Sequence, residues 1–305
     1  MIRTSILIPA KDEALNIRNC LDSVFSQASA SQFEVIVVDS GSTDGTPEIV
    51  EGYPVRLYRI PAQEFHHAGT RNYLASLAQG EYLVYLNADA FPTSPNWLNS
   101  LISNFADASI GAAYGRHLPK LDCNLERRTV LSAIYGDVRI VKEPSRKQEL
   151  GYRYYHLSTV NAAFRKDVWE ATGFPEDLKI FEDVGIAKRI LDAGWKIVYE
   201  PSATVYHSDN HTVVGLLKRY FDLGIVWKQL GIWDDEATQS SLFRDGWRLL
   251  RRRLARGDRG ENRGSRPLGA VIEDSAKYAG LLLGKNEQFL PLGIKRRISA
   301  ARIFG

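Results

Sequence analysis

The sequence is poor in cysteine and has no long hydrophobic run. Only Cys20 and Cys123 occur among its 305 residues, so the chain has no disulfide framework and suits a reducing compartment. The first apolar run, at residues 6–8, is much shorter than the core of a signal peptide. No later run approaches the roughly 18 apolar residues of a membrane span. We therefore expect a soluble, cytoplasmic protein.

The common glycine patterns of phosphate-binding loops are also missing. The chain contains neither Gly-x-Gly-x-x-Gly nor Gly-x-x-x-x-Gly-Lys-Ser/Thr, so nicotinamide dehydrogenases and P-loop enzymes lose their usual sequence support. There is no internal repeat and no low-complexity tract. The formal net charge of +3 is too small to indicate nucleic acid as a partner.

What the sequence does contain is a regular alternation of strand and helix patterns. The chain is 44% hydrophobic and 25% charged, which suffices for the core of one large or two modest domains. Strands are predicted at residues 5–9, 33–39, 55–60 and 82–86, and helices at 14–25, 47–51 and 68–78. Near-continuous apolar strands separated by helices indicate an α/β fold with a mostly parallel sheet covered on both faces.

Polar residues follow three of these strands directly, at residues 9–13, 39–45 and 87–89. Ligands bind outside the carboxyl ends of the strands in such sheets, so we expect the three segments to form one rim. Asp39 is well placed to accept a hydrogen bond from a base imide or a ribose hydroxyl. The alternative is that Asp39 only forms a turn, but its place at a strand end favours ligand binding.

The second half of the chain is less regular, and residues 116–157 are predicted to be a long excursion near an acceptor. A helix predicted at 182–193 opens with Glu182 and Asp183. The helix dipole favours negative charge in a first turn, so we expect Asp183 to stay ionised near neutral pH and to accept a proton as general base, with Glu182 shaping its position and pKa. The alternative is an acid pair that only satisfies the helix dipole.

Three further side chains suit a bound diphosphate. Asp89 could ligate a divalent cation, and His207 as an additional ligand would favour Mn²⁺ over Mg²⁺. Arg71, at the start of a predicted helix, suits phosphates or a nucleotide. Each signal is modest alone, because single acids, histidines after strands and helix arginines are often structural or simply solvated.

Taken in order along the chain, these segments resemble family 2 glycosyltransferases with the GT-A fold. The resemblance is carried by residues 37–46, 67–72, 80–89, 181–183 and 199–207, and it covers roughly residues 3–230. The segment Gly-Arg-His-Leu-Pro at 115–119 is similar to one in rhamnosyltransferase-like members. Five motifs in order are a specific signal.

The resemblance implies an inverting transfer of a sugar from a nucleotide-diphospho-sugar to a hydroxyl of a glycan or lipid-linked saccharide in cell-surface polysaccharide synthesis. The donor it implies first is dTDP-rhamnose, with UDP-hexoses next. Its implied site residues are Pro9, Glu13, Asp39, Arg71 and Asn87 at the nucleotide, Asp89 and His207 at a Mn²⁺ or Mg²⁺ ion, and Asp183 with Glu182 at the acceptor hydroxyl. The family's metal motif usually has two acids, and here Asn87 replaces the first.

We expect residues 1–210 to form the GT-A catalytic domain, with a nucleotide-binding half at 1–110 and an acceptor half at 111–210. Residues 211–305 are predicted to be a basic, amphipathic helical extension. Nine arginines against three acids give residues 244–266 a net charge of +6. Together with Trp227, Trp233 and Trp247, this predicts peripheral contact with the inner face of an anionic membrane. A helical cap on the catalytic domain or a homo-oligomer interface is an equally weighted alternative.

Two other functions compete with glycosyl transfer. A nucleotidyltransferase also uses an α/β sheet, a metal and acids, but it normally carries a glycine-rich basic loop after its first strand, and residues 9–13 contain no glycine. The second alternative is a non-catalytic protein of the same fold that binds sugar nucleotides or glycans. The replacement of the first acid of the metal motif by Asn87 favours this alternative.

Overall fold

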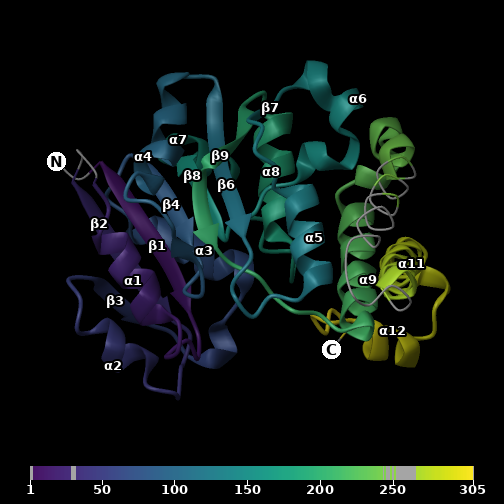
Figure 1. The fold of residues 1–305 in the computed structure, drawn as a ribbon, viewed down its shortest axis with the longest axis horizontal. Coiled ribbons are helices and arrows are strands. Elements are labelled where there is room, and N and C mark those ends of the chain that lie inside the picture. The colour runs from purple at the N-terminus through teal and green to yellow at the C-terminus, as the bar shows by residue number, and fades with distance from the viewer. Residues whose placement is uncertain are drawn as a thin grey trace.

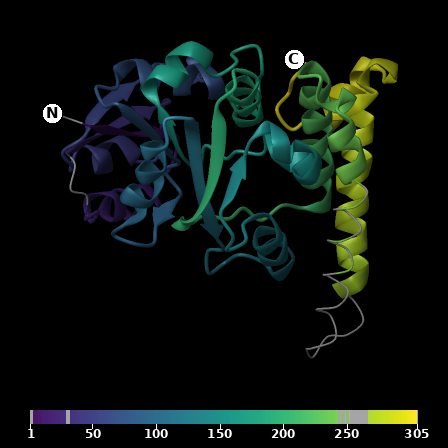
Figure 2. The same ribbon diagram turned by 90° about the horizontal axis from the view of Figure 1, so that it is seen from above.

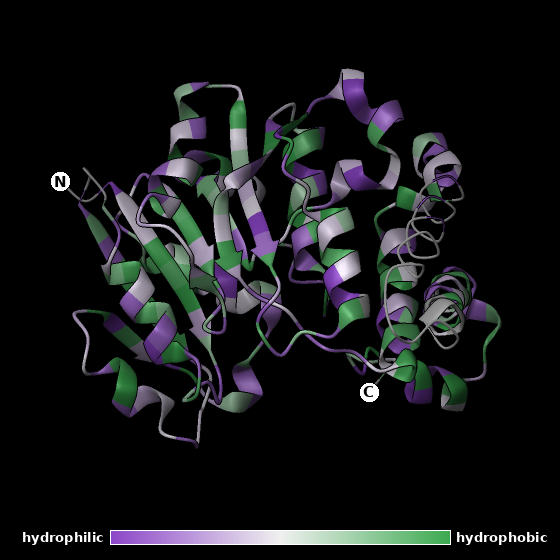
Figure 3. Ribbon diagram, viewed as in Figure 1, coloured by the Kyte–Doolittle hydropathy of each residue, from purple (hydrophilic) through white to green (hydrophobic). Residues whose placement is uncertain are grey.

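The computed structural model describes residues 3–28, 32–242, 244, 248, 251 and 266–304. A mixed sheet runs through the centre of the molecule, with helices on both of its faces (Figure 1). Among the described residues the sheet has nine strands. The hydropathy colouring shows its inner strands as largely hydrophobic (Figure 3).

Alternating strands and helices build the amino-terminal half of the sheet. The strands are β1 (Thr4–Ala10), β2 (Phe33–Asp39), β3 (Arg56–Arg59) and β4 (Tyr82–Leu86), and the helical elements are α1 (Ile17–Phe25), α2 (Thr46–Val50), η1 (Ala62–Glu64) and α3 (His67–Leu77). β1 lies parallel to both β2 and β4, and β2 lies parallel to β3. β1 and β4 are buried along almost their whole length, as expected for strands covered on both faces.

Strands of both directions complete the sheet. They are β5 (Phe91–Pro92), β6 (Ile110–Leu118), β7 (Ile140–Lys142), β8 (Asn161–Arg165) and β9 (Lys196–Tyr206). β8 is antiparallel to β4 and β6, whereas β6 and β9 are parallel. The order is β3-β2-β1-β4-β8-β6-β9-β5, and β7 also pairs with β9. The predicted mixed sheet flanked by helices is therefore confirmed, with its parallel strands concentrated in the amino-terminal half.

The second half is more regular than the sequence predicts. Its helical elements are α4 (Trp97–Ile102), η2 (Ser103–Ala106), α5 (Leu125–Ile134), η3 (Pro144–Arg146), α6 (Lys147–Leu150), η4 (Gly151–Tyr155), α7 (Lys166–Thr172) and α8 (Glu182–Asp192). β9 is a single strand of 11 residues. Its register against β6 shifts between Gly115 and Arg116, so an irregularity in pairing absorbs the intervening residues without ending the strand.

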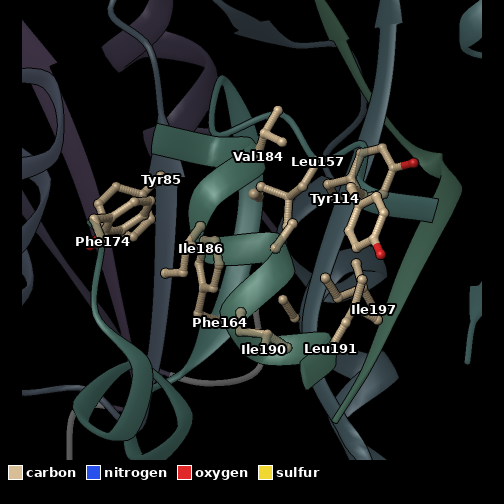
Figure 4. Packing of buried hydrophobic residues seen from close by; sticks show 14 of the residues in the cluster. Tyr85, Tyr114, Leu157, Phe164, Phe174, Val184, Ile186, Ile190, Leu191 and Ile197 are labelled. Carbon is tan, nitrogen blue, oxygen red and sulfur yellow. The ribbon is translucent and has the colours of Figure 1, made fainter. Parts of the chain in front are cut away.

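The apolar face of α8 fixes the position of the acid pair in its first turn. Ile186 and Ile190 are fully buried and lie over the sheet, near Phe164 and Ile197 (Figure 4). Full burial of each such side chain contributes about 1.5–3 kcal/mol. Because this face cannot rotate without exposing the core, the first turn of α8 has one orientation.

The carboxy-terminal region is a group of helices beside the catalytic sheet. It comprises α9 (Val213–Gln229), η5 (Ile232–Asp234), a helical stretch at 236–242, α11 (Arg266–Lys285), η7 (Glu287–Phe289) and α12 (Leu292–Ile298). Figure 2 shows α9 and α11 side by side at the end of the molecule opposite β1 to β3. None of the described helices is both long enough and apolar enough to cross a membrane.

Two of the tryptophans expected at a membrane surface are inside the protein instead. Trp227 and Trp233 are only 5% and 6% exposed and belong to the same hydrophobic core as the sheet residues. The expectation that they face a bilayer is therefore wrong, because packing against the catalytic domain buries them, as the helical-cap alternative predicts. Trp247 and most of the basic segment 244–266 lie outside the described residues.

Glycines allow α9 and α11 to approach closely. A Cβ atom on Gly284 would lie 2.1 Å from the backbone oxygen of Phe221, and one on Gly280 would lie 2.3 Å from that of Leu217. Real side chains do not tolerate such distances, so the two helices must separate if either glycine is replaced. This close contact holds the end of the chain against α9.

We predict that Gly284→Ala lowers the free energy of unfolding by about 1–3 kcal/mol, the usual cost of overpacking. Gly269→Ala is the matched control on the same helix, because a Cβ atom there meets nothing within 4 Å. Since alanine favours helix by about 1 kcal/mol over glycine, the control should be neutral or stabilising in thermal unfolding. Equal behaviour of the two variants would contradict the close packing of α9 and α11.

Candidate active site

The carboxyl ends of β1 and β2 carry two loops that are joined by hydrogen bonds. The backbone N–H of Asp12 donates to Ser42 Oγ at 2.8 Å, and that of Thr43 donates to Asp12 Oδ1 at 2.9 Å. Asp44 Oδ2 accepts from the N–H of Ala14 at 2.9 Å. Because β1 and β2 are parallel neighbours, both loops lie on one edge of the sheet, as the rim predicted from the sequence requires.

Asp39 offers a buried acceptor at this edge. Its side chain is 2% exposed, and its Oδ2 accepts from the N–H groups of Gly41 and Ser42, both at 3.1 Å. Its Oδ1 is buried and has no partner among the described residues. A buried acceptor without a partner is costly, so this atom is suited to a ligand N–H or O–H. Pro9 lies beside Asp39, paired with Val38 across the two strands.

Glu13 stands between the nucleotide edge and the acids that follow β4. Its Oε2 accepts from Asn16 Nδ2 at 2.8 Å. Burial raises the pKa of Glu13, the negative charge of Asp89 raises it further, and the positive charge of Lys120 opposes the shift. Glu13, Asp89 and Lys120 are therefore electrostatic neighbours.

Asp89, His207 and Asp209 bring three ligand atoms within 4.8 Å of one another. His207 Nε2 lies 3.4 Å from Asp89 Oδ2, and burial lowers the pKa of His207, which favours the neutral imidazole that metals require. His207 Nδ1 is buried without a partner. Two carboxylates and an imidazole suit a divalent ion of the Mn²⁺ type. Asp209 escaped the sequence analysis because it lies in an exposed turn just beyond β9.

Lys120 forms an ion pair with one member of this group, Asp89. Its Nζ lies 3.3 Å from Asp89 Oδ2. The ammonium group therefore compensates the carboxylate, and it would have to share Asp89 with a bound cation or move from it. The residues fit a divalent ion, with Lys120 as a second positive charge beside a diphosphate.

Arg71 connects the nucleotide edge to α8. Its Nη1 lies 2.9 Å from Glu182 Oε1, and both side chains are only 7% exposed. Its Nη2 lies 3.5 Å from Asn87 Oδ1, two residues before Asp89. From the sequence, Arg71 and Asn87 are expected at the nucleotide, and Glu182 beside the general base Asp183. The structure brings all three together, and their contacts with a ligand stay predictions.

Asp183 follows Glu182 and is partly exposed. Burial raises the pKa of Asp183 to about 7, and the negative charge of Glu182 adds to the shift. The N–H of Val184 donates to Asp183 Oδ1 at 2.8 Å, and this hydrogen bond opposes the rise in the pKa of Asp183. The expectation that the helix dipole keeps this acid ionised at neutral pH is therefore corrected, because desolvation outweighs the dipole and Asp183 titrates near pH 7.

The backbone before the acid pair is strained. Phe181 has φ of +60°, a left-handed conformation that bulky residues rarely adopt. The loop that precedes α8 thus reaches the first turn at an unusual angle. This turn presents Glu182 inward to Arg71, while Asp183 stays partly open to solvent.

A sequence model described as glycosyl transferase family 2 matches residues 5–173, which is more than half of the chain. The matched span contains the two hydrogen-bonded loops that follow β1 and β2, and it also contains Arg71, Asn87 and Asp89. The chain belongs to glycosyl transferase family 2. Family membership favours glycosyl transfer over nucleotidyl transfer.

Curated relatives of this family 2 glycosyltransferase include two O-antigen chain rhamnosyltransferases. WbaN of Salmonella anatum is 33% identical over 277 residues, which are 90% of this chain and 87% of the relative. RfbN of Salmonella typhimurium is 29% identical over 301 residues, which are 98% of this chain and 94% of the relative. The rhamnosyltransferase-like resemblance is thereby confirmed.

A solved structure shows the same architecture. The mannosyltransferase PcManGT of Pyrobaculum calidifontis, in complex with GDP-Man and Mn²⁺, has a TM-score of 0.62 at 21% sequence identity, with 94% of this chain and 86% of that chain covered. This likeness confirms the GT-A fold of the family 2 glycosyltransferase.

Proposed function

We propose that this glycosyltransferase moves a sugar, with L-rhamnose from dTDP-rhamnose as the first candidate, to a hydroxyl of a glycan or lipid-linked saccharide with inversion. The observation that carries the proposal is one continuous chain of contacts. Asp183 adjoins Glu182, Glu182 contacts Arg71, Arg71 contacts Asn87, and Asn87 is two residues from the Asp89 group. These contacts support the placing of the base and the diphosphate in one site.

The chemistry follows from these positions. Asp183 accepts the proton of the acceptor hydroxyl as its oxygen forms a bond to the anomeric carbon. The bond from that carbon to the diphosphate oxygen breaks, and its electron pair leaves with the nucleoside diphosphate. Lys120 stabilises the departing negative charge, and a divalent ion held by Asp89, His207 and Asp209 would supply further positive charge. A single displacement from the opposite face inverts the anomeric centre.

The pKa of Asp183 suits this role. A general base works best when its pKa lies near the working pH, and about 7 meets this condition. Burial and Glu182 make the carboxylate more basic than an ordinary aspartate, so it takes the hydroxyl proton more readily.

The rhamnose donor is supported by the two O-antigen rhamnosyltransferase relatives. Asp39 Oδ1 supports a base with an imide N–H, as in thymine or uracil, because this buried atom can only accept a hydrogen bond unless it is protonated.

We also propose peripheral contact with the inner face of the membrane, through residues other than Trp227 and Trp233. Phe289, at the end of η7, is 77% exposed, and Leu292 and Ile294 on α12 are 52% and 46% exposed. The exposed Arg296 and Arg297 lie on the same short helix, α12. Apolar and basic side chains together suit an anionic bilayer. Failure to co-sediment with anionic vesicles at low salt would remove this contact.

We predict that Asp183→Asn lowers transfer by about 10²- to 10⁴-fold and leaves the affinity for dTDP with Mn²⁺ unchanged. The turnover rate of the wild-type protein should decrease as the pH is lowered below about 7, because Asp183 is then protonated and cannot accept the hydroxyl proton. The variant should also melt at a higher temperature, since it no longer buries a charge.

Asp177→Asn, in an exposed loop position of the same segment, is the matched control. Near wild-type turnover of Asp183→Asn would eliminate the role of Asp183 and leave a binding protein as the alternative.

A second prediction concerns the divalent ion. Removal of metal by a chelator should abolish transfer, and Mn²⁺ should restore it. Asp209→Asn should raise the Mn²⁺ concentration needed for half-maximal rate by roughly tenfold or more, because a charged ligand is lost. Asp137→Asn, an exposed acid without a partner among the described residues, should behave as wild type. Full activity in the presence of the chelator would refute metal dependence.

A further inference from the structure

Two arginines near Asp183 have no acidic partner among the described residues. Arg127 lies on α5 and Arg219 on α9, and no described carboxylate lies within ion-pair distance of either. Arg127 Nε is buried and lacks a hydrogen-bond partner. The neighbouring Arg128, in contrast, donates to the backbone oxygens of Cys123, Lys120 and Leu121. The positive charges of Arg127 and Arg219 are thus not compensated by any described carboxylate.

Arg219 is held beside the acid pair. Its guanidinium lies 4.9 Å from the centre of the Phe181 ring, and Phe181 immediately precedes Glu182 and Asp183. The positive charge of Arg219 lowers the pKa of Asp183, against the larger effect of burial. A cation–π contact fixes the guanidinium plane without neutralising its charge.

Arg127 lies on α5, the helix that ends before Tyr135. Burial raises the pKa of Tyr135, and both arginines oppose that shift. Tyr135 is therefore an electrostatic neighbour of both arginines and of Asp183. Its ring stacks on His117, whose ring contacts that of His207, so the end of α5 lies beside the Asp89, His207 and Asp209 group.

Hydrogen bonds between the segments before α5 and α9 fix this arrangement. The N–H of Asn124 donates to Asn210 Oδ1 at 3.0 Å, and Asn210 Nδ2 donates to the backbone oxygen of Asp122 at 3.0 Å. The two helices therefore start at the same end of the molecule (Figure 1).

Apolar side chains surround this start. Leu121 is 99% exposed, and Leu125, Val213 and Val214 are 51%, 39% and 63% exposed. They lie on the same two segments that the Asn124 and Asn210 hydrogen bonds join. Exposed apolar residues beside uncompensated cations suit a ligand with an anionic group on an apolar chain.

We propose that Arg127 and Arg219 bind a phosphate of the acceptor and thereby place its hydroxyl against Asp183, with Leu121, Leu125, Val213 and Val214 contacting an apolar chain attached to that phosphate. This inference rests on the proposed glycosyl transfer. It makes the two arginines specificity-determining residues for an acceptor whose saccharide is joined to a lipid through phosphate. The donor diphosphate, the other phosphate of the reaction, is assigned to the Asp89 group.

The test uses geranyl diphosphate as a probe of the lipid phosphate, with geraniol and inorganic pyrophosphate as its two halves. Binding to the full chain is measured by calorimetry with saturating Mn²⁺ and dTDP, UDP or GDP, whichever binds, so that the donor site is filled. Geranyl diphosphate should bind wild type more tightly than either half. Arg127→Gln and Arg219→Gln should each weaken it by about 10- to 100-fold, the worth of a charged hydrogen bond of 1.5–3 kcal/mol. Arg219→Lys should retain part of the affinity.

Lys218→Gln is the matched control, because it removes the same charge from the adjacent position of α9. It should leave geranyl diphosphate binding unchanged, and thermal unfolding shows whether each variant is folded. Loss of nucleotide affinity in the arginine variants would assign these residues to the donor, and unchanged geranyl diphosphate binding would end the proposal. Equal binding of pyrophosphate and geranyl diphosphate would overturn the apolar contact. If no nucleotide binds at all, the proposed glycosyl transfer itself fails.

Discussion

The buried ion pair between Arg71 and Glu182 is the interaction on which the site depends. It joins α3 to the first turn of α8 at 2.9 Å, with both side chains nearly inaccessible to water. Arg71 also reaches Asn87 at the end of β4. Removing one partner of such a pair leaves an uncompensated buried charge and typically costs about 3–5 kcal/mol. The pair therefore fixes α3 and the end of β4 relative to the first turn of α8, which carries Asp183.

The same pair separates the roles of two adjacent acids. Glu182 forms an ion pair with Arg71, whereas Asp183 remains partly exposed and has its pKa raised to about 7 by burial and by Glu182. The environment thus gives neighbouring carboxylates of similar chemistry different functions. The apolar face of α8, buried beneath them, holds both in place (Figure 4).

Charge is distributed around Asp183 in a way that suits two anionic substrates. Lys120 accompanies the Asp89, His207 and Asp209 group on the donor side. Arg127 and Arg219 lie on the side of the carboxy-terminal helices. α9 therefore contributes both to the core, through Trp227, and to the surroundings of Phe181 and the acid pair, through Arg219.

The sequence predicts those features that depend on local pattern. Strand ends located Asp39 and Asp89, and helix periodicity located the Glu182 and Asp183 turn. The sequence did not predict β6, whose Gly111 and Gly115 interrupt the apolar pattern. Asp209, Arg127 and Arg219 carry no local signal, because only tertiary packing brings them to the site. The burial of Trp227 and the raised pKa of Asp183 are likewise consequences of long-range packing that no short segment encodes.

A double-mutant cycle on Arg71→Met and Glu182→Gln, followed by chemical unfolding, tests the central role of the ion pair most directly. Each single change should lower the free energy of unfolding by about 3–5 kcal/mol. The double variant should be at least about 1 kcal/mol more stable than the sum of the two losses predicts, because neither charge is then left buried alone. Strictly additive losses would contradict the claim that this pair connects the donor edge to the base.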